Sequence, residues 1–591
     1  MSARPSLFSE LKRRNVLRAA ALYAGAVWAF GQGLSQFSPA LGLPDVTTRW
    51  FLIAAAIGFP FWIAFAWLYE FTPQGLKRES EIAADDSFAH STGRKLDKWI
   101  IAVLAIAVVL LLTDRFVSHK QAGGITDKSI AVLPLNNDSG EKDQQYFSDG
   151  LSEDLITALS QFAGLKVIAR DSSFKFRNST DDAKTIGEKL GVAHLLEGSV
   201  QRAGDTVRVS ATLINAVDGS AIWSQHYDRP YKDLFALQDD ITRQVASALK
   251  AKLLDNGSAV LQSDRPPSGN LAAWDAFLKG QFYFQLGTEE DFRRAIEQFT
   301  AATRLDPDYA AAYAAAAQTR VDLTGYYLEA AEWPHSYAQV RVDVDAALRL
   351  NPVLAAAHVA NSSLLCNADA NWEGWLTEAR RAVVLAPENA GAYFQLSTAE
   401  AGHGRVASAV RFVEKAVARN PLNGFWRSWL AYYLASLGRL DEAATTAQQG
   451  IALQSQGALN YRILTYIEVV RGDAAAALAA AGKAPTGRNR DIAMAWALQL
   501  GSDRAAADAA LAHLIAADAG NSSYQIAQTY ALRRDPASVF EWLDRARADR
   551  DGGIQYLAYD PIILRYKDDP RFIAFAKKVG LPTTTDAKAM P

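Results

Sequence analysis

The side chains best placed to do chemistry form one acidic cluster in the first third of the chain. Asp149, Glu153 and Asp154 are spaced to share about one turn of a helix that begins near residue 148. Two carboxylates can act as general acid and general base. Carboxylates in the first turn of a helix also stabilise its dipole, with no ligand involved. We therefore expect this cluster to be structural.

Motifs for other kinds of chemistry are missing from the sequence. The 591 residues contain no phosphate-binding loop ending in Lys and Ser or Thr, no His-Glu-x-x-His and no Gly-x-Ser-x-Gly. The eight histidines are scattered without metal-ligand spacing. The single cysteine, Cys366, excludes an internal disulfide framework. The sequence predicts a protein that is not an enzyme and needs no cofactor or metal.

Composition limits the class of protein and of partner. Half of the residues are apolar and 21% are charged, so most of the chain should fold. A length of 591 residues favours about three to five folding units. The formal net charge is −3, without the basic excess that nucleic-acid binding needs. We expect no nucleic-acid partner.

Three apolar segments in the first 117 residues predict membrane helices. Residues 50–70 carry no charge before Glu70 and match the thickness of a bilayer core. Residues 16–37 are less apolar, and a cleaved signal peptide is rejected there because no clean cleavage site follows. Residues 99–117 are short, so a buried soluble helix is the alternative. We predict a three-helix anchor within residues 1–127.

Basic residues predict how this anchor is oriented. Four precede the first segment and Arg18 lies at its start, and five lie between the second and third, whereas Arg49 is the only one between the first and second. Basic segments stay in the cytoplasm, which places residues 71–98 there. We expect a multi-pass protein of the bacterial inner membrane whose soluble domains are periplasmic. Losing the first or third span would invert this orientation.

Residues 128–254 predict a small α/β domain with a mixed sheet. An apolar strand at 129–135 is followed by a helix from about 148 to 162 and a second strand at 165–169. This order predicts a parallel crossover. The remaining predicted elements are a helix at 181–191, an antiparallel meander of strands at 195–200, 207–214 and 221–227, and a helix at 234–248.

Five stretches of this domain carry a family resemblance. They read SIAVLPL, YFSDGLSEDLITALS, LKVIAR, LGVAHLLEGSVQRAGDTVRVSATLINAVDGSAIWSQHYDR and LFALQDDIT. In this order they resemble the TolB amino-terminal (FlgO-like) domain family. The resemblance implies a non-catalytic module of the cell envelope that makes protein contacts. Relatives often carry a cyclase or winged-helix domain ahead of it, but residues 1–127 offer only apolar segments and a loop, so neither activity is expected.

A polar linker at 255–270 leads into an alanine-rich region with a repeat. Small residues recur at intervals of 45, 35, 34 and 34, at Ala302, Ala347, Ala382, Ala416 and Gly450. Proline follows the first four of these after five residues. This pattern resembles the tetratricopeptide repeat. It predicts an all-α solenoid over 271–550, degraded beyond 455, with an insertion near 324–336. Residues 551–591 would form a polar cap and tail.

Stacked repeats leave a groove that could hold a protein or peptide. Aromatic residues of the first helices are candidate contacts: Tyr283, Tyr313, Tyr393, Trp426, Trp429, Tyr432 and Tyr433. The alternative is that each of them packs between helices. Asp149 and Gly150 are further candidates, since they follow the first strand, where open α/β sheets bind ligands.

The leading functional hypothesis is a membrane-anchored scaffold or assembly factor that acts by binding. A second hypothesis is a sensor whose α/β domain binds a small envelope molecule and relays the signal through the membrane helices. A third, an enzyme without a recognisable motif, would need a convergent polar cluster. The sequence does not identify the partner, the pathway or the oligomeric state.

Overall fold

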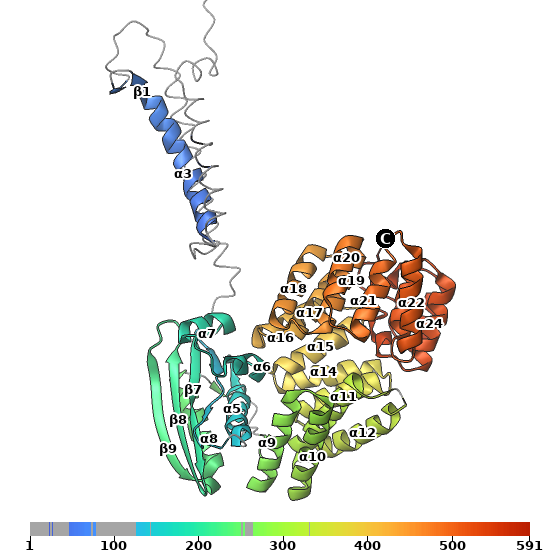
Figure 1. Ribbon diagram of the computed structural model, residues 1–591. Coiled ribbons are helices and arrows are strands. Elements are labelled where there is room, and N and C mark those ends of the chain that lie inside the picture. Colours follow the sequence, from blue (N-terminus) through green and yellow to red (C-terminus); the bar gives the residue numbers. More distant parts are fainter. Residues whose placement is uncertain are drawn as a thin grey trace, which may run out of the picture. The chain divides into compact units, whose positions relative to one another are not determined.

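The computed structural model describes residues 23, 27, 46–72, 75–78, 126–141, 144–249, 252–253, 264–329 and 331–590. The chain forms two compact units, Met1–Gly124 and Ile125–Pro591. In the first unit, helix α3 (Val46–Leu68) is followed by an antiparallel hairpin of β1 (Tyr69–Thr72) and β2 (Gly75–Arg78) (Figure 1).

The apolar segment predicted at 50–70 lies mostly in α3, which contains Pro60. The hydroxyl of Tyr23 donates a hydrogen bond to the carbonyl of Ala55 in this helix, at 2.7 Å. Within the described residues, no helix has both the length and the apolar character needed to cross a bilayer. The predicted segments at 16–37 and 99–117 lie outside the described residues, except for Tyr23 and Val27.

The second unit begins with a six-stranded mixed sheet. Its strands are β3 (Ser129–Val132), β4 (Asn136–Asn137), β6 (Lys166–Val167), β7 (His194–Ala203), β8 (Thr206–Asn215) and β9 (Ala221–Pro230). The order is β6-β3-β7-β8-β9, with β4 pairing β7. β3 runs parallel to β6 and β7, whereas β7, β8 and β9 are antiparallel. The predicted mixed sheet is confirmed. A separate short pair joins β5 (Phe162–Ala163) to β10 (Lys252–Leu253).

Helices cover this sheet unevenly, as Figure 1 shows. α5 (Gln145–Leu159) and α8 (Leu234–Ala248) share a core with the inward residues of β8, such as Val209 and Leu213. α7 (Ala183–Leu190) packs on the opposite face of β3. β3 is buried on both faces, which explains its uninterrupted apolar sequence. β9 is largely exposed.

This domain differs from the sequence-based prediction in two places. α5 begins at Gln145 and not near residue 148 as predicted, so Ser148 and Asp149 lie inside the helix. The earlier start brings the ring of Phe147 into the core, where it is 1% exposed. The short helix α6 (Arg170–Ser173) and the 3₁₀ turn η3 (Phe174–Phe176) were not predicted. Their sequence has no helical periodicity, and they are held by contacts with the repeats.

Residues 271–548 form eight helix pairs in a tetratricopeptide-like solenoid. The first helices are α9 (Leu271–Leu286), α11 (Ala310–Tyr326), α13 (Ala355–Asn367), α15 (Ala390–Gly402), α17 (Gly424–Ser436), α19 (Ala458–Arg471), α21 (Arg488–Leu498) and α23 (Ser523–Leu532). The second helices are α10 (Glu289–Leu305), α12 (Trp333–Leu350), α14 (Trp372–Leu385), α16 (Val406–Arg419), α18 (Leu440–Leu453), α20 (Ala474–Lys483), α22 (Arg504–Asp518) and α24 (Pro536–Ala548).

The recurring small residues lie where paired helices touch. Ala302, Ala347, Ala382 and Ala416 are fully buried. Gly450 faces the hydroxyl of Ser428, so an added Cβ would lie 2.8 Å from that oxygen. Close helix contact therefore explains the spacing that the sequence displays. The insertion predicted at 324–336 spans the end of α11 and the beginning of α12.

The C-terminal segment, residues 551–590, differs from the predicted polar end cap. It contains η5 (Gly552–Tyr556), η6 (Leu564–Tyr566) and α25 (Pro570–Val579), and much of it is buried. The ring of Tyr559 lies 5.7 Å from that of Tyr432 and 5.6 Å from that of Tyr433, both on α17. The segment therefore returns to the middle of the array, because its apolar residues complete the core there.

The tail then binds two turns of the array. The carboxylate of Asp586 accepts hydrogen bonds from the backbone N–H groups of Val406 and Ala407, at 2.7 and 2.9 Å. These N–H groups belong to the first two residues of α16, and the N-cap residue of this helix, Arg405, makes no side-chain cap. The backbone N–H of Lys588 donates to the carbonyl of Ser436 at 2.7 Å. The tail thus ties the second-helix start of one repeat to the first-helix end of the next.

The α/β domain and the repeats share one hydrophobic core. Trp274 of α9 is fully buried, with its ring 5.8 Å from that of Phe147 and 5.7 Å from that of Phe235. Its indole N–H donates to the Asp154 carboxylate at 3.2 Å. Further along the array, the hydroxyl of Ser172 donates to the side chain of Asn420 at 2.5 Å. The α/β domain is therefore anchored to the array at two separated points.

Candidate functional site

A large cavity opens between the repeats, the C-terminal segment and α6, and we call it the channel. Its volume is about 1320 Å³. Its walls come from the ends of α9 and α11, the starts of α17, α19 and α21, and residues 550–556. It exceeds the roughly 300–1,000 Å³ of typical small-molecule sites. The channel therefore has room for a segment of polypeptide.

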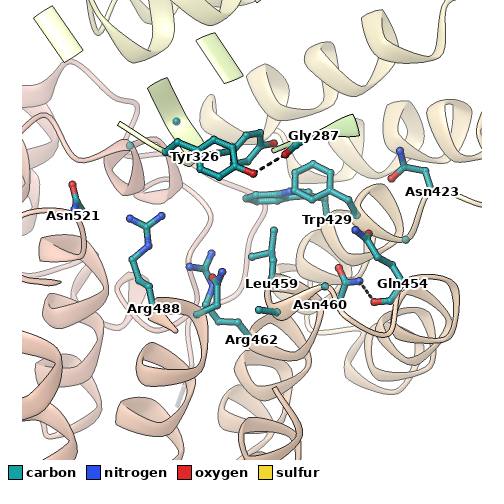
Figure 2. Close-up of a pocket in the computed structure, with 18 of the residues that line it drawn as sticks. Gly287, Tyr326, Asn423, Trp429, Gln454, Leu459, Asn460, Arg462, Arg488 and Asn521 are labelled. Atoms are coloured by element: carbon teal, nitrogen blue, oxygen red, sulfur yellow. Dashed lines mark hydrogen bonds between the residues drawn. The ribbon is translucent and has the colours of Figure 1, made fainter. Parts of the chain in front are cut away.

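Aromatic side chains form one wall of the channel. Trp429 of α17 and Tyr326 of α11 lie across the cavity from two arginines (Figure 2). The ring of Tyr556 lies 5.6 Å from that of Trp429. Tyr326 is 58% exposed, and its neighbour Tyr327 is fixed by a hydrogen bond from its hydroxyl to the carbonyl of Gly287, at 2.6 Å. This wall offers a large apolar surface to a partner.

The opposite wall carries Arg462 of α19 and Arg488 of α21, whose guanidinium groups enter the same space (Figure 2). Burial lowers the pKa of Arg462. Arg488 is 43% exposed, and its Nε lies 3.7 Å from a carboxylate oxygen of Asp518. The channel therefore combines cations with aromatic rings.

Amide side chains at the channel form hydrogen bonds with other residues of the array. Asn423 caps α17 by accepting a hydrogen bond from the backbone N–H of Trp426, at 3.0 Å. Asn460 accepts from the hydroxyl of Ser428 at 2.9 Å, and its amide donates to the carbonyls of Gly450 and Gln454. These side chains hold α17 and α19 at the channel edge, which leaves the arginines and the rings to meet a partner.

The structure separates the predicted aromatic candidates. Trp429 lines the channel, whereas Trp426 lines a second cavity of about 780 Å³ and stacks on Phe394 at 5.1 Å. Tyr433 is fully buried and Tyr432 is 6% exposed, both against the C-terminal segment. For these two tyrosines the packing alternative applies, because the chain's own residues fill the groove beside α17.

The remaining tyrosine candidates pack within the array. Tyr393 is 7% exposed, stacks on Phe412 at 6.3 Å and lies beneath the guanidinium of Arg419 at 4.9 Å. Tyr283 is half-buried against the shared core, and Tyr313 is half-buried where α11 meets its neighbours. None of these three lines the channel.

Asp149 and Gly150 are buried inside the chain, which removes them as surface contacts. The Asp149 carboxylate accepts hydrogen bonds from Arg177 at 2.6 Å and from Gln145 at 2.8 Å. An added Cβ on Gly150 would lie 2.5 Å from the side chain of Leu278, so this glycine permits α5 to approach α9. Asp149 thus holds segments of the α/β domain together, and Gly150 serves the contact with the first repeat.

Sequence reasoning missed Arg462, Arg488, Tyr326 and residues 550–556. The net charge of the whole chain is near neutral, so it gives no sign of the excess of positive charge at the channel. The signal that could have revealed Arg462 is a lone arginine among apolar residues of a first helix, NYRILTYI. Residues 550–556 line the channel because the chain turns back toward the middle of the array, and no local sequence pattern predicts that reversal.

The residues described by the structure hold no group of three or more His, Cys, Asp or Glu that could bind a metal. Burial raises the pKa of the Cys366 thiol, which opposes formation of a reactive thiolate. The geometry supports recognition through charge and aromatic surface.

A family model described as "HilA/YgeH-like transcriptional regulator, second domain" matches residues 126–244, the stretch that forms the α/β domain. The resemblance to the TolB amino-terminal family stays an expectation for this stretch. The "Putative adenylate cyclase 3" of Rhizobium meliloti (strain 1021) is 39% identical over 191 residues. The match spans 32% of this chain and 31% of that protein. It covers too little of either chain to carry the relative's activity across.

Solved repeat proteins are similar to parts of the array. A thermophilic TPR protein of Thermus thermophilus shows 18% identity and a TM-score of 0.27, over 32% of this chain and 93% of that one. Pseudomonas aeruginosa PilF shows 16% identity and a TM-score of 0.30, over 41% and 98%. A tetratricopeptide repeat protein of Parabacteroides merdae shows 13% identity and a TM-score of 0.32, over 47% of this chain and 100% of that one. Scores this low carry no argument about this chain, whose fold is evident from its own helix pairs.

Proposed function

We propose that this protein acts by binding a segment of a partner protein in the channel, as a scaffold or assembly factor. The observation that carries this proposal is the channel itself. The C-terminal segment fills the groove beside α17 but leaves about 1320 Å³ open between aromatic and basic walls. Stacked helices that expose such a surface recognise partners without making or breaking bonds.

Photo-crosslinking tests this proposal in cells of the source organism. A benzophenone side chain replacing Leu459, which lines the channel, is expected to capture a partner of defined mass. The matched control replaces Val342, which is 59% exposed on α12 and lies outside the channel. Capture at neither position, or the same products at both, would contradict channel binding.

We propose further that residues 1–127 anchor the protein in a bacterial inner membrane and that the α/β domain and repeats lie in the periplasm. The distribution of basic residues around the apolar segments supports this orientation. Alkaline phosphatase fused after residue 591 should then be active, and a cytoplasm-only fluorescent reporter at the same position should be dark. Fluorescence without phosphatase activity would place the soluble domains in the cytoplasm. The alternative sensor function stays a prediction.

A further inference from the structure

Arg462 is a partly buried cation to which the described residues offer no hydrogen bond and no ion pair. It lies near the beginning of α19, and burial lowers its pKa. It lines both the channel and a narrow recess of about 20 Å³ bounded by Trp429 and Tyr556. Partial burial of a cation without a paired carboxylate costs free energy, and a ligand that brings the opposite charge reduces that cost.

The channel as a whole has an excess of positive charge. Its lining includes five basic residues, Arg170, Lys175, Arg462, Arg488 and Arg550, and two acidic ones, Asp171 and Asp551. Of the basic residues, Arg170 pairs with Glu153 at 3.0 Å and Arg488 lies 3.7 Å from Asp518. Both acids are engaged: Asp171 accepts from two asparagine amides, and Asp551 accepts from two backbone N–H groups. A chain of net charge −3 therefore presents a locally cationic cavity.

Helix beginnings add to this positive potential. α19 and α21 start at the channel, and their N-cap residues, Gly457 and Gly487, make no side-chain cap. At the beginning of the neighbouring α23, the Asp551 carboxylate accepts a hydrogen bond from the backbone N–H of Tyr524 at 2.9 Å. First-turn N–H groups without a cap favour an anionic group. α19 has no acidic residue in its first turn, and Asp491 in the first turn of α21 caps none of its N–H groups.

The array already binds carboxylates of its own chain in this manner. Asp551 lies at the beginning of α23, and Asp586 at the beginning of α16. Both come from the C-terminal segment, which runs against the repeats much as a bound peptide would. These two contacts show that carboxylates of a polypeptide bind at helix beginnings of this array.

We propose that the channel recognises an acidic segment of the partner protein. One carboxylate lies between Arg462 and Arg488 at the beginnings of α19 and α21, and an adjacent apolar side chain packs against Trp429 and Tyr326. This inference rests on the proposed function, to which it adds the chemistry of the bound segment. Arginine is suited to the role because its planar fork binds a carboxylate through two hydrogen bonds.

Fluorescence anisotropy tests the inference with two labelled decapeptides, one of alternating glutamate and leucine and one of alternating glutamine and leucine. The full chain should bind the glutamate peptide at least about tenfold more tightly. Arg462→Gln should weaken binding of the glutamate peptide tenfold or more and leave the glutamine peptide unchanged. The control is Arg439→Gln, whose arginine pairs with Glu442 outside the channel and whose loss should not affect either peptide.

Three results would overturn the inference. They are equal binding of the two peptides, glutamate-peptide binding that survives Arg462→Gln, and tighter Arg462-dependent binding of a labelled oligothymidylate than of the glutamate peptide. Unfolding midpoints of both variants confirm that each remains folded. Crosslinking from residue 459 separates the two levels: capture of a partner together with equal peptide binding would retain the proposed function and reject the acidic segment.

Discussion

Replacing Asp560 by alanine should lower the free energy of unfolding by about 3–5 kcal/mol. Its carboxylate is fully buried and accepts four hydrogen bonds. The donors are the hydroxyls of Tyr466 at 2.5 Å and Tyr524 at 3.0 Å, the amide of Gln528 at 2.7 Å and the backbone N–H of Ile562 at 3.0 Å. Without the carboxylate these donors lose their acceptor in a site closed to water. Urea unfolding of the purified chain measures the loss.

The same substitution should release the C-terminal segment from the array. Asp560 joins this segment to α19 and α23, so hydrogen exchange in residues 552–566 should become faster in the alanine variant. Asp560→Asn should fall between the two, because its amide keeps one acceptor oxygen. Asp568→Ala is the control: its carboxylate is 87% exposed, and its loss should cost less than about 0.5 kcal/mol. Equal stability of Asp560→Ala and the parent would refute a structural role for this network.

Replacing Asp154 by asparagine should reduce the pH dependence of stability. Burial, reinforced by the charge of Asp264, raises the pKa of Asp154 to about 8. Its Oδ1 and the Oε1 of Gln238 have no hydrogen-bond donor among the described residues, which favours the protonated acid. Between pH of about 4 and 8 the unfolded chain releases a proton that the folded chain retains. Each pH unit in this window therefore removes about 1.4 kcal/mol of stability, and Asp154→Asn eliminates that contribution.

Urea unfolding at pH 5, 6 and 7 measures this slope. Part of it should persist in Asp154→Asn, because burial also raises the pKa of Glu153 to about 7 and that of Asp264 to about 6. Asp205→Asn, at an exposed turn of the same domain, should keep the slope of the parent. An unchanged slope in Asp154→Asn would mean that this carboxyl is ionised in the folded chain.

Local patterns predicted the elements and their classes well. Alternating residues in β8 and continuous apolar residues in β3 predicted a meander and an apolar strand, and both are present. The spacing of Ala382 and Ala416 predicted paired helices, since only small side chains fit where the helices touch. These patterns predict structure because they depend on residues that lie close together in the sequence.

The candidate site could be predicted only in part. Trp429 was identified because first helices face the groove, and it does line the channel. Tyr433 has the same signal but is fully buried, because Tyr559 returns from 126 residues further along the chain to cover it. Asp149 and Gly150 are covered in the same way by α6 and α9. Burial of this kind depends on contacts between distant segments, which local composition does not encode.

The sequence by itself determined the repeat, the mixed sheet and the absence of recognisable catalytic motifs, because each follows from periodicity or spacing along the chain. Tertiary structure alone decided which surface stays open. The C-terminal segment occupies part of the groove and supplies carboxylates to two helix beginnings, while Arg462, on neighbouring α19, is left unpaired. Whether a charge is paired depends on what packs beside it, and in this array its potential partners come from distant parts of the chain.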